Sequence, residues 1–257
     1  MTGLGVDHLS LRYGSRLILD DVSLQANPRE MIALVGPNGA GKTSLLRAIV
    51  GLVEASGVIT LGDQQVSRLS ANQRARRLGY LPQGHALHWP IPVRDVVALG
   101  RYPLGVRDPG RLSAPDQAAV DAALRATDTM QFCERSAMAL SGGERARVAL
   151  ARVLALEAPI LLADEPTASL DPRHQIEVME CLANIARNGA VVIVVTHDLL
   201  LAARYCDRVI VMAQGRIHAD GAPETALAAA VLSDVFQVSP AMFVHEGRTL
   251  AVPWRAV

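Results

Sequence analysis

The sequence predicts an α/β fold in which helices cover a mainly parallel sheet. Three apolar runs, MIALV (31–35), PILLADEP (159–166) and AVVIVVTHD (190–198), are as continuous as strands buried on both faces should be. The helical pattern SLLRAIVGL (44–52) follows the first run, and EVMECLANIAR (177–187) separates the other two. Strands that alternate with helices in this way form the crossover units of a parallel sheet.

A glycine-rich loop lies between the first strand and its helix. GPNGAGKT, from Gly36 to Thr43, fills every fixed position of the pattern G-x-x-x-x-G-K-[ST]. In such a P-loop the backbone N–H groups surround phosphate oxygens, Lys42 reaches the β- and γ-phosphates, and the Thr43 hydroxyl binds Mg²⁺. A chance glycine turn is the weaker interpretation. We therefore expect ATP and Mg²⁺ as ligands, with ATP contacted by Gly36, Pro37, Asn38, Gly39, Ala40, Gly41, Lys42, Thr43 and Ser44.

Alternating patterns precede this core and a helical segment interrupts it. VDHLSLRY (6–13), LILDDVSLQA (17–26) and GVITLGDQQV (57–66) predict an antiparallel N-terminal sheet. The pattern becomes helical from about 69 to 127. We expect a helical subdomain, at roughly 84–157, to be inserted in the P-loop core of a single domain that spans residues 1–257.

The C-terminal part returns to strands. DRVIVMAQGRIHADG (207–221) predicts two strands joined through Gln214 and Gly215. APETALAAAVLSDVFQ (222–237) is helical in pattern, and 242–254 predicts a short hairpin around Glu246 and Gly247.

Composition excludes several classes of function. The 257 residues contain 25 Lys+Arg and 25 Asp+Glu, so no basic excess favours nucleic acid as a partner. The three cysteines form no C-x-x-C pair, which argues against zinc and disulfide frameworks. No apolar run approaches the roughly 20 residues of a membrane span. A role at a membrane would therefore act through a partner.

Acidic residues end the second apolar strand. Asp164 suits Mg²⁺, directly or through water, because open α/β sheets present ligand-binding groups at the carboxyl ends of their strands. Glu165 follows, and Pro166 favours an extended backbone for it, which would aim its carboxylate at a water in line with the γ-phosphate. We expect Glu165 to be the general base for attack of water on that phosphate. Two solvated acids at a strand end are the alternative.

Two further polar residues follow strands. His197 ends the third apolar strand, and we expect it to bind the γ-phosphate or orient the attacking water, although a lone histidine is more often structural. Gln83 ends the strand-like segment LGYLPQG, where a neutral amide suits Mg²⁺. Gln83 alone would carry no functional meaning.

A second glycine pair opens a predicted helix. Ser141 and Glu144, three residues apart before an apolar run, predict a capping box. They do not explain Gly142 and Gly143, because glycine in a helix costs roughly 1 kcal/mol relative to alanine. Glycine does allow a ligand to approach the N–H groups of a helix start closely.

These segments together resemble one family. GPNGAGKT, LPQ, LSGGE, LLADEP, SLD and VTHD occur in the order of the motifs of ABC transporter nucleotide-binding subunits. The resemblance covers nearly the whole chain and implies an ABC ATPase fold. It identifies Gln83 with the Q-loop, Asp164 and Glu165 with Walker B and His197 with the switch histidine. Tyr13 resembles the aromatic that stacks on adenine, with an ordinary strand aromatic as the alternative.

The resemblance also implies a dimer. In this family two subunits pack head to tail, and the signature helix of one covers the ATP of the other. The residues that would act on the partner's ATP in this way are Ser141, Gly142, Gly143, Glu144 and Asp171. The implied partners are a second copy, integral membrane permease subunits and, indirectly, a solute-binding protein, and the implied location is the cytoplasmic face of the inner (plasma) membrane.

Two classes of function remain on this resemblance. One is the ATPase subunit of an importer, and the other is a soluble ABC ATPase such as an iron–sulfur cluster assembly factor. We expect Trp89, Ile91 and Val93 to be exposed and to receive the permease, which favours the importer; burial in a core is the alternative. VRDVVALGRYP (93–103) resembles cassettes of importers for iron–siderophore complexes, haem and cobalamin. A cassette for zinc, manganese or another solute is the nearest competitor.

Overall fold

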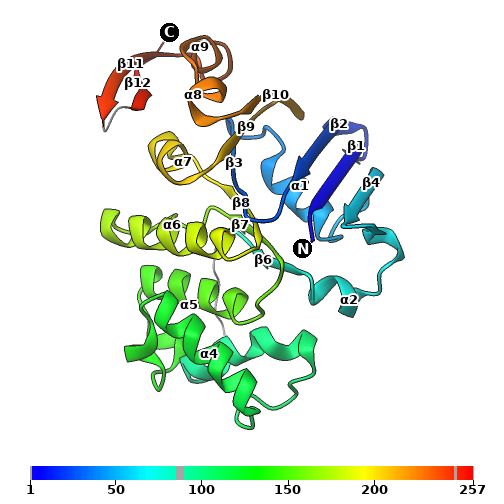
Figure 1. Cartoon of the computed structure of the whole chain (residues 1–257), viewed down its shortest axis with the longest axis vertical. Helices are drawn as coiled ribbons and strands as arrows, with labels where there is room; N and C mark the ends of the chain where they lie inside the picture. The colour runs from blue at the N-terminus through cyan, green and yellow to red at the C-terminus, as the bar shows by residue number, and fades with distance from the viewer. Residues whose placement is uncertain (1, 85–89, 246–247, 257) are drawn as a thin grey trace.

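A computed structural model of the chain describes residues 2–84, 90–245 and 248–256. It has an upper lobe that contains the sheets and a lower lobe of helices (Figure 1). The upper lobe is built around a six-stranded sheet in the order β10-β9-β3-β8-β7-β6. Its strands are β3 (Met31–Val35), β6 (Leu78–Leu81), β7 (Ile160–Asp164), β8 (Val191–Val195), β9 (Arg208–Ala213) and β10 (Arg216–Gly221).

The register of this sheet brings the ends of its central strands to one edge. β3, β6, β7, β8 and β9 run parallel, and only β10 pairs antiparallel, with β9. Leu34 in β3 and Asp164 in β7 both pair with Val195 at the end of β8. The loops that follow these strands therefore emerge together, as the sequence predicts.

The N-terminal sheet is antiparallel, as predicted, in the order β2-β1-β4-β5. Its strands are β1 (Leu4–Tyr13), β2 (Arg16–Ala26), β4 (Ser56–Leu61) and β5 (Gln64–Gln65). A separate pair, β11 (Val238–His245) and β12 (Arg248–Ala256), forms the predicted C-terminal hairpin.

Nine α-helices lie within the described part of the chain, and none of them is long and apolar enough to cross a membrane. They are α1 (Lys42–Ile49), α2 (Ala71–Ala75), α3 (Val93–Ala98), α4 (Ala114–Ala126), α5 (Gly142–Leu154), α6 (Pro172–Arg187), α7 (Leu199–Tyr205), α8 (Pro223–Ala226) and α9 (Ala229–Phe236). Short 3₁₀ helices are η1 (Val66–Arg68), η2 (Leu99–Leu104), η3 (Met130–Phe132) and η4 (Ala137–Ala139). The helical pattern expected from about residue 69 is wrong in part, because β6 follows α2.

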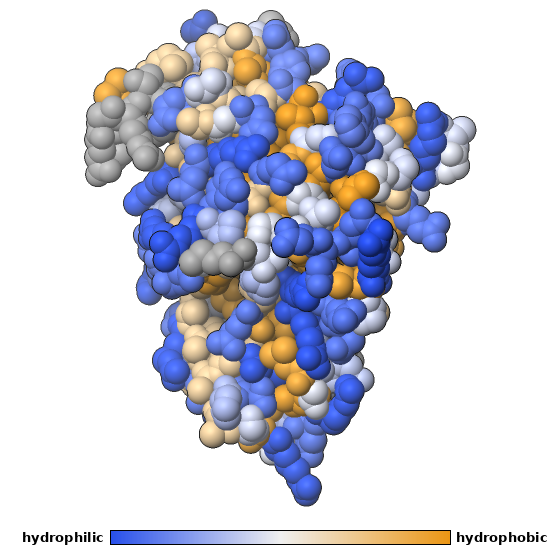
Figure 2. Space-filling view, turned by 45° about the vertical axis from the view of Figure 1, so that its right-hand side comes forward, coloured by the Kyte–Doolittle hydropathy of each residue, from blue (hydrophilic) through white to orange (hydrophobic). Residues whose placement is uncertain are grey.

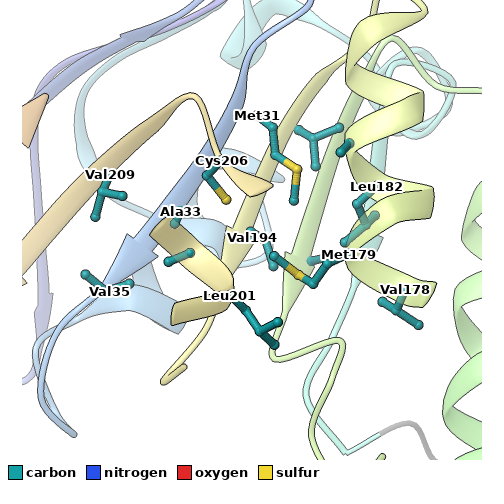
Figure 3. Packing of buried hydrophobic residues seen from close by; sticks show 14 of the residues in the cluster. Met31, Ala33, Val35, Val178, Met179, Leu182, Val194, Leu201, Cys206 and Val209 are labelled. Atoms are coloured by element: carbon teal, nitrogen blue, oxygen red, sulfur yellow. The ribbon is translucent and has the colours of Figure 1, made fainter. Parts of the chain in front are cut away.

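The central sheet is covered on both faces, which explains the continuous apolar runs. All residues of β3, β7 and β8 are buried. On one face Ala33 and Val194 lie among Met179 and Leu182 of α6 and Leu201 of α7 (Figure 3). The opposite face packs against α1 and the N-terminal sheet.

The lower lobe has its own apolar core between α3, α4 and α5. Val93 is fully buried in that core, and the half-buried Ile91 packs against it. The expectation that these two residues are exposed for a permease is therefore wrong, because α3 turns its valines toward α4 and α5. Trp89 lies outside the described residues.

Candidate active site

The P-loop connects β3 to α1 and is shaped by its glycines. Gly36, Gly39 and Gly41 have φ values of 148°, 79° and 99°, which side chains with a Cβ rarely adopt. A Cβ on Gly36 would lie 2.1 Å from the carbonyl oxygen of Met212, and one on Gly41 would lie 2.8 Å from Leu19. The loop is thus held tightly against β9 and β2 and leads directly into the first turn of α1.

Lys42 is the first residue of α1, and its side chain folds back over the loop. Its Nζ donates to the carbonyl oxygens of Gly36, at 2.7 Å, and Pro37, at 3.0 Å. Burial lowers the pKa of Lys42, and the carboxylates of Glu165 and Asp164 oppose that shift. The ammonium group is therefore held at the phosphate loop, within the electrostatic reach of both acids.

Asp164 is the last residue of β7 and is fully buried. Neither of its carboxylate oxygens has a hydrogen bond of ordinary geometry among the described residues, although the Thr43 hydroxyl is close enough to lower the pKa of Asp164. Burial is the main cause that raises the pKa of Asp164. A buried carboxylate without a partner is costly unless a cation or donor completes it.

Glu165 is held between the two polar residues that end neighbouring strands. Its Oε1 lies 2.9 Å from Nε2 of His197, and its Oε2 accepts from Nε2 of Gln83 at 2.9 Å. The sequence places each of these residues at the end of a strand, and the structure brings Gln83 and His197 into direct contact with Glu165. The amide nitrogen of Gln83 donates to the expected base, whereas the sequence predicts Mg²⁺ as the partner of this amide.

The backbone of Glu165 differs from the expectation. Its φ is 53°, in the left-handed region, whereas Pro166 was expected to favour an extended conformation. The N–H of Glu165 donates to Val195, and its carbonyl accepts from Ala168, so a tight turn overrides that preference. Left-handed backbone at a residue with a Cβ costs of order 1–3 kcal/mol and is concentrated at functional sites.

Ser141 opens α5 with the predicted capping box. Its Oγ accepts from the N–H of Glu144 at 3.3 Å, and the Glu144 carboxylate accepts from the N–H of Ser141 at 2.7 Å. This contact is also the main cause that lowers the pKa of Glu144. A Cβ on Gly142 would meet nothing within 4 Å, so no contact inside the chain requires this glycine.

The start of α5, with Ser141, Gly142, Gly143 and Glu144, does not lie at the P-loop of its own chain. α5 lies in the lower lobe and α1 in the upper lobe (Figure 1). Asp171 caps α6, where its carboxylate accepts from the N–H of His174 at 3.0 Å. The preceding Leu170 lies 3.4 Å from a Cβ placed on Gly143, so the segment before α6 and the start of α5 are neighbours.

Tyr13 ends β1 at a tight turn and is 48% exposed. The strand that follows the turn, β2, contacts the P-loop through Ile18 and Leu19, which lie beside Gly41. The ring is therefore available on a hairpin that borders the phosphate loop.

Sequence reasoning missed Tyr80, which lies in β6. Its hydroxyl is buried and has no hydrogen bond of ordinary geometry in the described part of the chain. Burial and the carboxylate of Asp164 raise the pKa of Tyr80, and the nearby Arg47 opposes that shift. Tyr80 pairs with Leu162 in β7, so it shares a face with Asp164 two residues further on.

Comparison with known proteins decides the family. The model of the family described as ABC transporter matches residues 19–168. The chain belongs to the ABC transporter family. It is 46% identical to a "Hemin import ATP-binding protein HmuV" of Streptomyces coelicolor over 96% of this chain and 89% of that protein.

Two solved structures extend the comparison. A dimeric ATP-binding cassette in a post-hydrolysis state, bound to ADP and phosphate, has a TM-score of 0.75 and 26% identity, with 86% of this chain and 98% of that chain covered. A candidate metal-chelate type ABC transporter in an inward-facing conformation has a TM-score of 0.82 over 99% of this chain and 98% of that chain; at 22% identity it supports the fold alone. The predicted ABC ATPase fold and the predicted activity, ATP hydrolysis coupled to transport, are confirmed.

Proposed function

We propose that this ABC transporter chain binds and hydrolyses ATP to drive import of haem or a related metal chelate, such as an iron–siderophore complex or cobalamin. The observation that carries the proposal is the meeting of Gln83, Glu165 and His197 beside the P-loop, in a chain 46% identical to a hemin import ATP-binding protein. The solute is the part of the proposal that rests on the relatives and on the segment 93–103.

ATP binds along the P-loop in this proposal. The N–H groups of Gly36 to Ser44 and the start of α1 surround its phosphates. Lys42 exchanges its contacts with the Gly36 and Pro37 carbonyls for contacts with the β- and γ-phosphates. Tyr13 stacks on the adenine ring from the bordering hairpin.

The residues at the end of β7 fit Mg²⁺. The two unpartnered oxygens of the buried Asp164 suit a hard cation, and Thr43 at the start of α1 and Gln83 after β6 complete the set. When bound, Mg²⁺ neutralises charge on the phosphates. Asp164 would then gain a counter-charge in addition to those of Lys42 and Arg47.

We propose that Glu165 changes partners during hydrolysis. As general base it accepts the proton of the attacking water on one carboxylate oxygen. Gln83 and His197 each contact one of the two oxygens in this structure, so the opening of one contact would give the water access to that oxygen. His197, released from Glu165, orients the water or donates to the γ-phosphate.

A second copy completes the site. Ser141 and Gly142 are exposed at the start of α5, and Gly142 has open space around it. We infer that Ser141, Gly142, Gly143, Glu144 and Asp171 act on the ATP of the partner. The glycines then allow the partner's phosphate to approach the N–H groups of α5.

The remaining partners follow from the importer proposal. Integral membrane permease subunits bind the chain at the cytoplasmic face of the inner membrane, and a solute-binding protein acts through them. A soluble ABC ATPase and a cassette for zinc or manganese remain the alternatives. The name of the first relative favours the importer of a metal chelate over both.

Uptake by a deletion strain tests the proposal. We expect loss of the gene to reduce uptake of labelled haem, ferric siderophore or cobalamin. The wild-type chain should restore uptake on a plasmid, and Glu165→Gln should not. Unchanged uptake of all three compounds in a strain without a redundant importer would contradict the assigned solute class and leave the ATPase activity in place.

A further inference from the structure

The C-terminal hairpin carries an unusual concentration of exposed apolar side chains. Phe243 in β11 and Trp254 in β12 are 47% and 63% exposed, and Val244 is 74% exposed. The rings of Phe243 and Trp254 form a tilted pair with centroids 6.1 Å apart. Exposed apolar residues on a surface are usually scattered singly, and a cluster marks an interaction site.

The hairpin uses only part of its surface to pack on the body. Val238 and Ala251 contact the core of the upper lobe, and Met242 and Ala251 border a small space next to Ala203 of α7. Phe243 follows Met242 in the strand and so faces the opposite side. Figure 1 shows the hairpin projecting from the upper lobe beyond α7. We call the exposed aromatic residues Phe243 and Trp254 the outer hairpin surface.

The base of the hairpin is continuous with the nucleotide edge of the sheet. A cavity of ≈ 770 Å³ is lined on one side by Pro37 and Asn38 of the P-loop and by His197. Val252 and Pro253 of β12 line its other side. A body that sits on the P-loop in contact with His197 would therefore also reach the hairpin.

The permease is a poorer occupant of this surface. The segment 93–103, which resembles the corresponding part of importer cassettes, lies in the lower lobe, whereas the hairpin lies at the far end of the upper lobe (Figure 1). The lower lobe has exposed apolar residues of its own in Tyr102, Leu104 and Met138. On the face shown in Figure 2, apolar residues likewise appear in both lobes.

We propose that the outer hairpin surface binds a second copy of this chain and enlarges the ATP-dependent dimer. The proposal rests on the dimer of the proposed function and adds a contact to it beyond the nucleotide. In a two-fold dimer every contact occurs twice, so the aromatic pair of each subunit would be covered by its partner. Aromatic side chains at the centre of an interface commonly dominate its affinity.

Sedimentation velocity with ATP and Mg²⁺ tests this contact, in full-length Glu165→Gln chain that retains ATP. We expect Phe243→Ser with Trp254→Ser to weaken dimerisation at least tenfold, which corresponds to about 1.4 kcal/mol. The matched control is Leu52→Ser, because Leu52 is 65% exposed and follows the end of α1 away from the nucleotide edge. The control should dimerise as the parent does, and all variants should bind ATP equally as monomers.

A second readout does not depend on the folding of the double variant. In a Trp89→Phe background Trp254 is the single tryptophan, and its emission should shift to the blue when the dimer forms. If the dimer forms without a shift in Trp254 emission, and the hairpin variants dimerise as strongly as the parent, this contact is overturned and the dimer of the proposed function is not. A parent that binds ATP without forming any dimer would overturn the dimer of the proposed function, and this contact with it.

Discussion

Arg101 is a buried charged residue that connects separate elements of the lower lobe, and its replacement tests how much these contacts stabilise the lobe. Its side chain is 9% exposed, and its guanidinium bonds to Asp116 at 2.8 Å, Glu157 at 2.7 Å and the Ala155 carbonyl at 2.9 Å. These bonds join η2 to the start of α4 and to the end of α5. Gly100 before it is equally constrained, since a Cβ there would lie 2.0 Å from the Arg152 carbonyl oxygen. Gly100 and Arg101 therefore fix the position of η2 against α4 and the end of α5.

The magnitude follows from these contacts. Arg101→Met keeps much of the volume but removes the only donor to the buried Ala155 carbonyl found among the described contacts and one of the two side-chain donors to Asp116, and each such bond to a charged group is worth about 1.5–3 kcal/mol. Glu157 is 66% exposed, so its share is small. We expect a loss of about 3–4 kcal/mol, or roughly 6–16 °C in the midpoint of thermal unfolding.

Urea and thermal unfolding followed by circular dichroism measure this loss. Arg111→Met is the matched control, because Arg111 is 89% exposed and lies 3.6 Å from Asp108; it should change stability by less than about 0.5 kcal/mol. The pKa of Asp116 is lowered, first by the Ser113 hydroxyl and then by Arg101. Because the pKa of Asp116 in the folded chain lies below its ordinary value of 3.8, its contacts stabilise the fold at pH values above 3.8. That contribution is lost as the pH falls through the lowered pKa. The stability difference between the wild-type chain and Arg101→Met should therefore become smaller in acid. Equal stability of the two variants at pH 7 would refute the reasoning.

Two further predictions concern α5 and the composite site. Gly142→Ala should leave thermal stability unchanged or slightly raised, since a Cβ there meets nothing within 4 Å and alanine favours helix. It should lower ATPase activity at least tenfold, because the added methyl group prevents the partner's phosphate from approaching. Full activity would show that nothing packs on Gly142. Mixing Ser141→Arg with Lys42→Ala, each inactive alone, should restore some ATPase activity, because a mixed dimer has one intact site. No recovery over several mixing ratios, with mixed dimers shown to form, would argue against sites shared between subunits.

Local patterns predicted most of the fold because the hydrophobic pattern and the capping residues of each strand or helix lie within that segment. The apolar runs of β7 and β8 and the capping box at Ser141 needed no distant information. The burial of Val93 was misjudged for the opposite reason, and no local pattern indicated the burial of Arg101. Their neighbours Leu124, Asp116 and Glu157 lie far along the chain, so burial there is a property of tertiary packing.

The candidate site shows the same division. The motifs placed Asp164, Glu165 and His197 at the carboxyl ends of strands, and parallel strands end together. They placed Gln83 after a strand-like segment without saying where that strand lies. They gave neither the contacts of Glu165 with both neighbours nor its left-handed backbone, which depends on a hydrogen bond to Val195. Tyr80 escaped notice because an aromatic in a strand has no chemical signature of its own.

The central claim is that Glu165 acts as the base of an ATPase at this edge. The direct measurement is steady-state release of phosphate by Glu165→Gln with Mg²⁺ and ATP, together with titration of a fluorescent ATP analogue. The account predicts nucleotide affinity close to that of the wild-type chain and turnover lower by about 10²–10⁴-fold, the usual contribution of a general base. Turnover near the wild-type rate, with nucleotide bound, would contradict it.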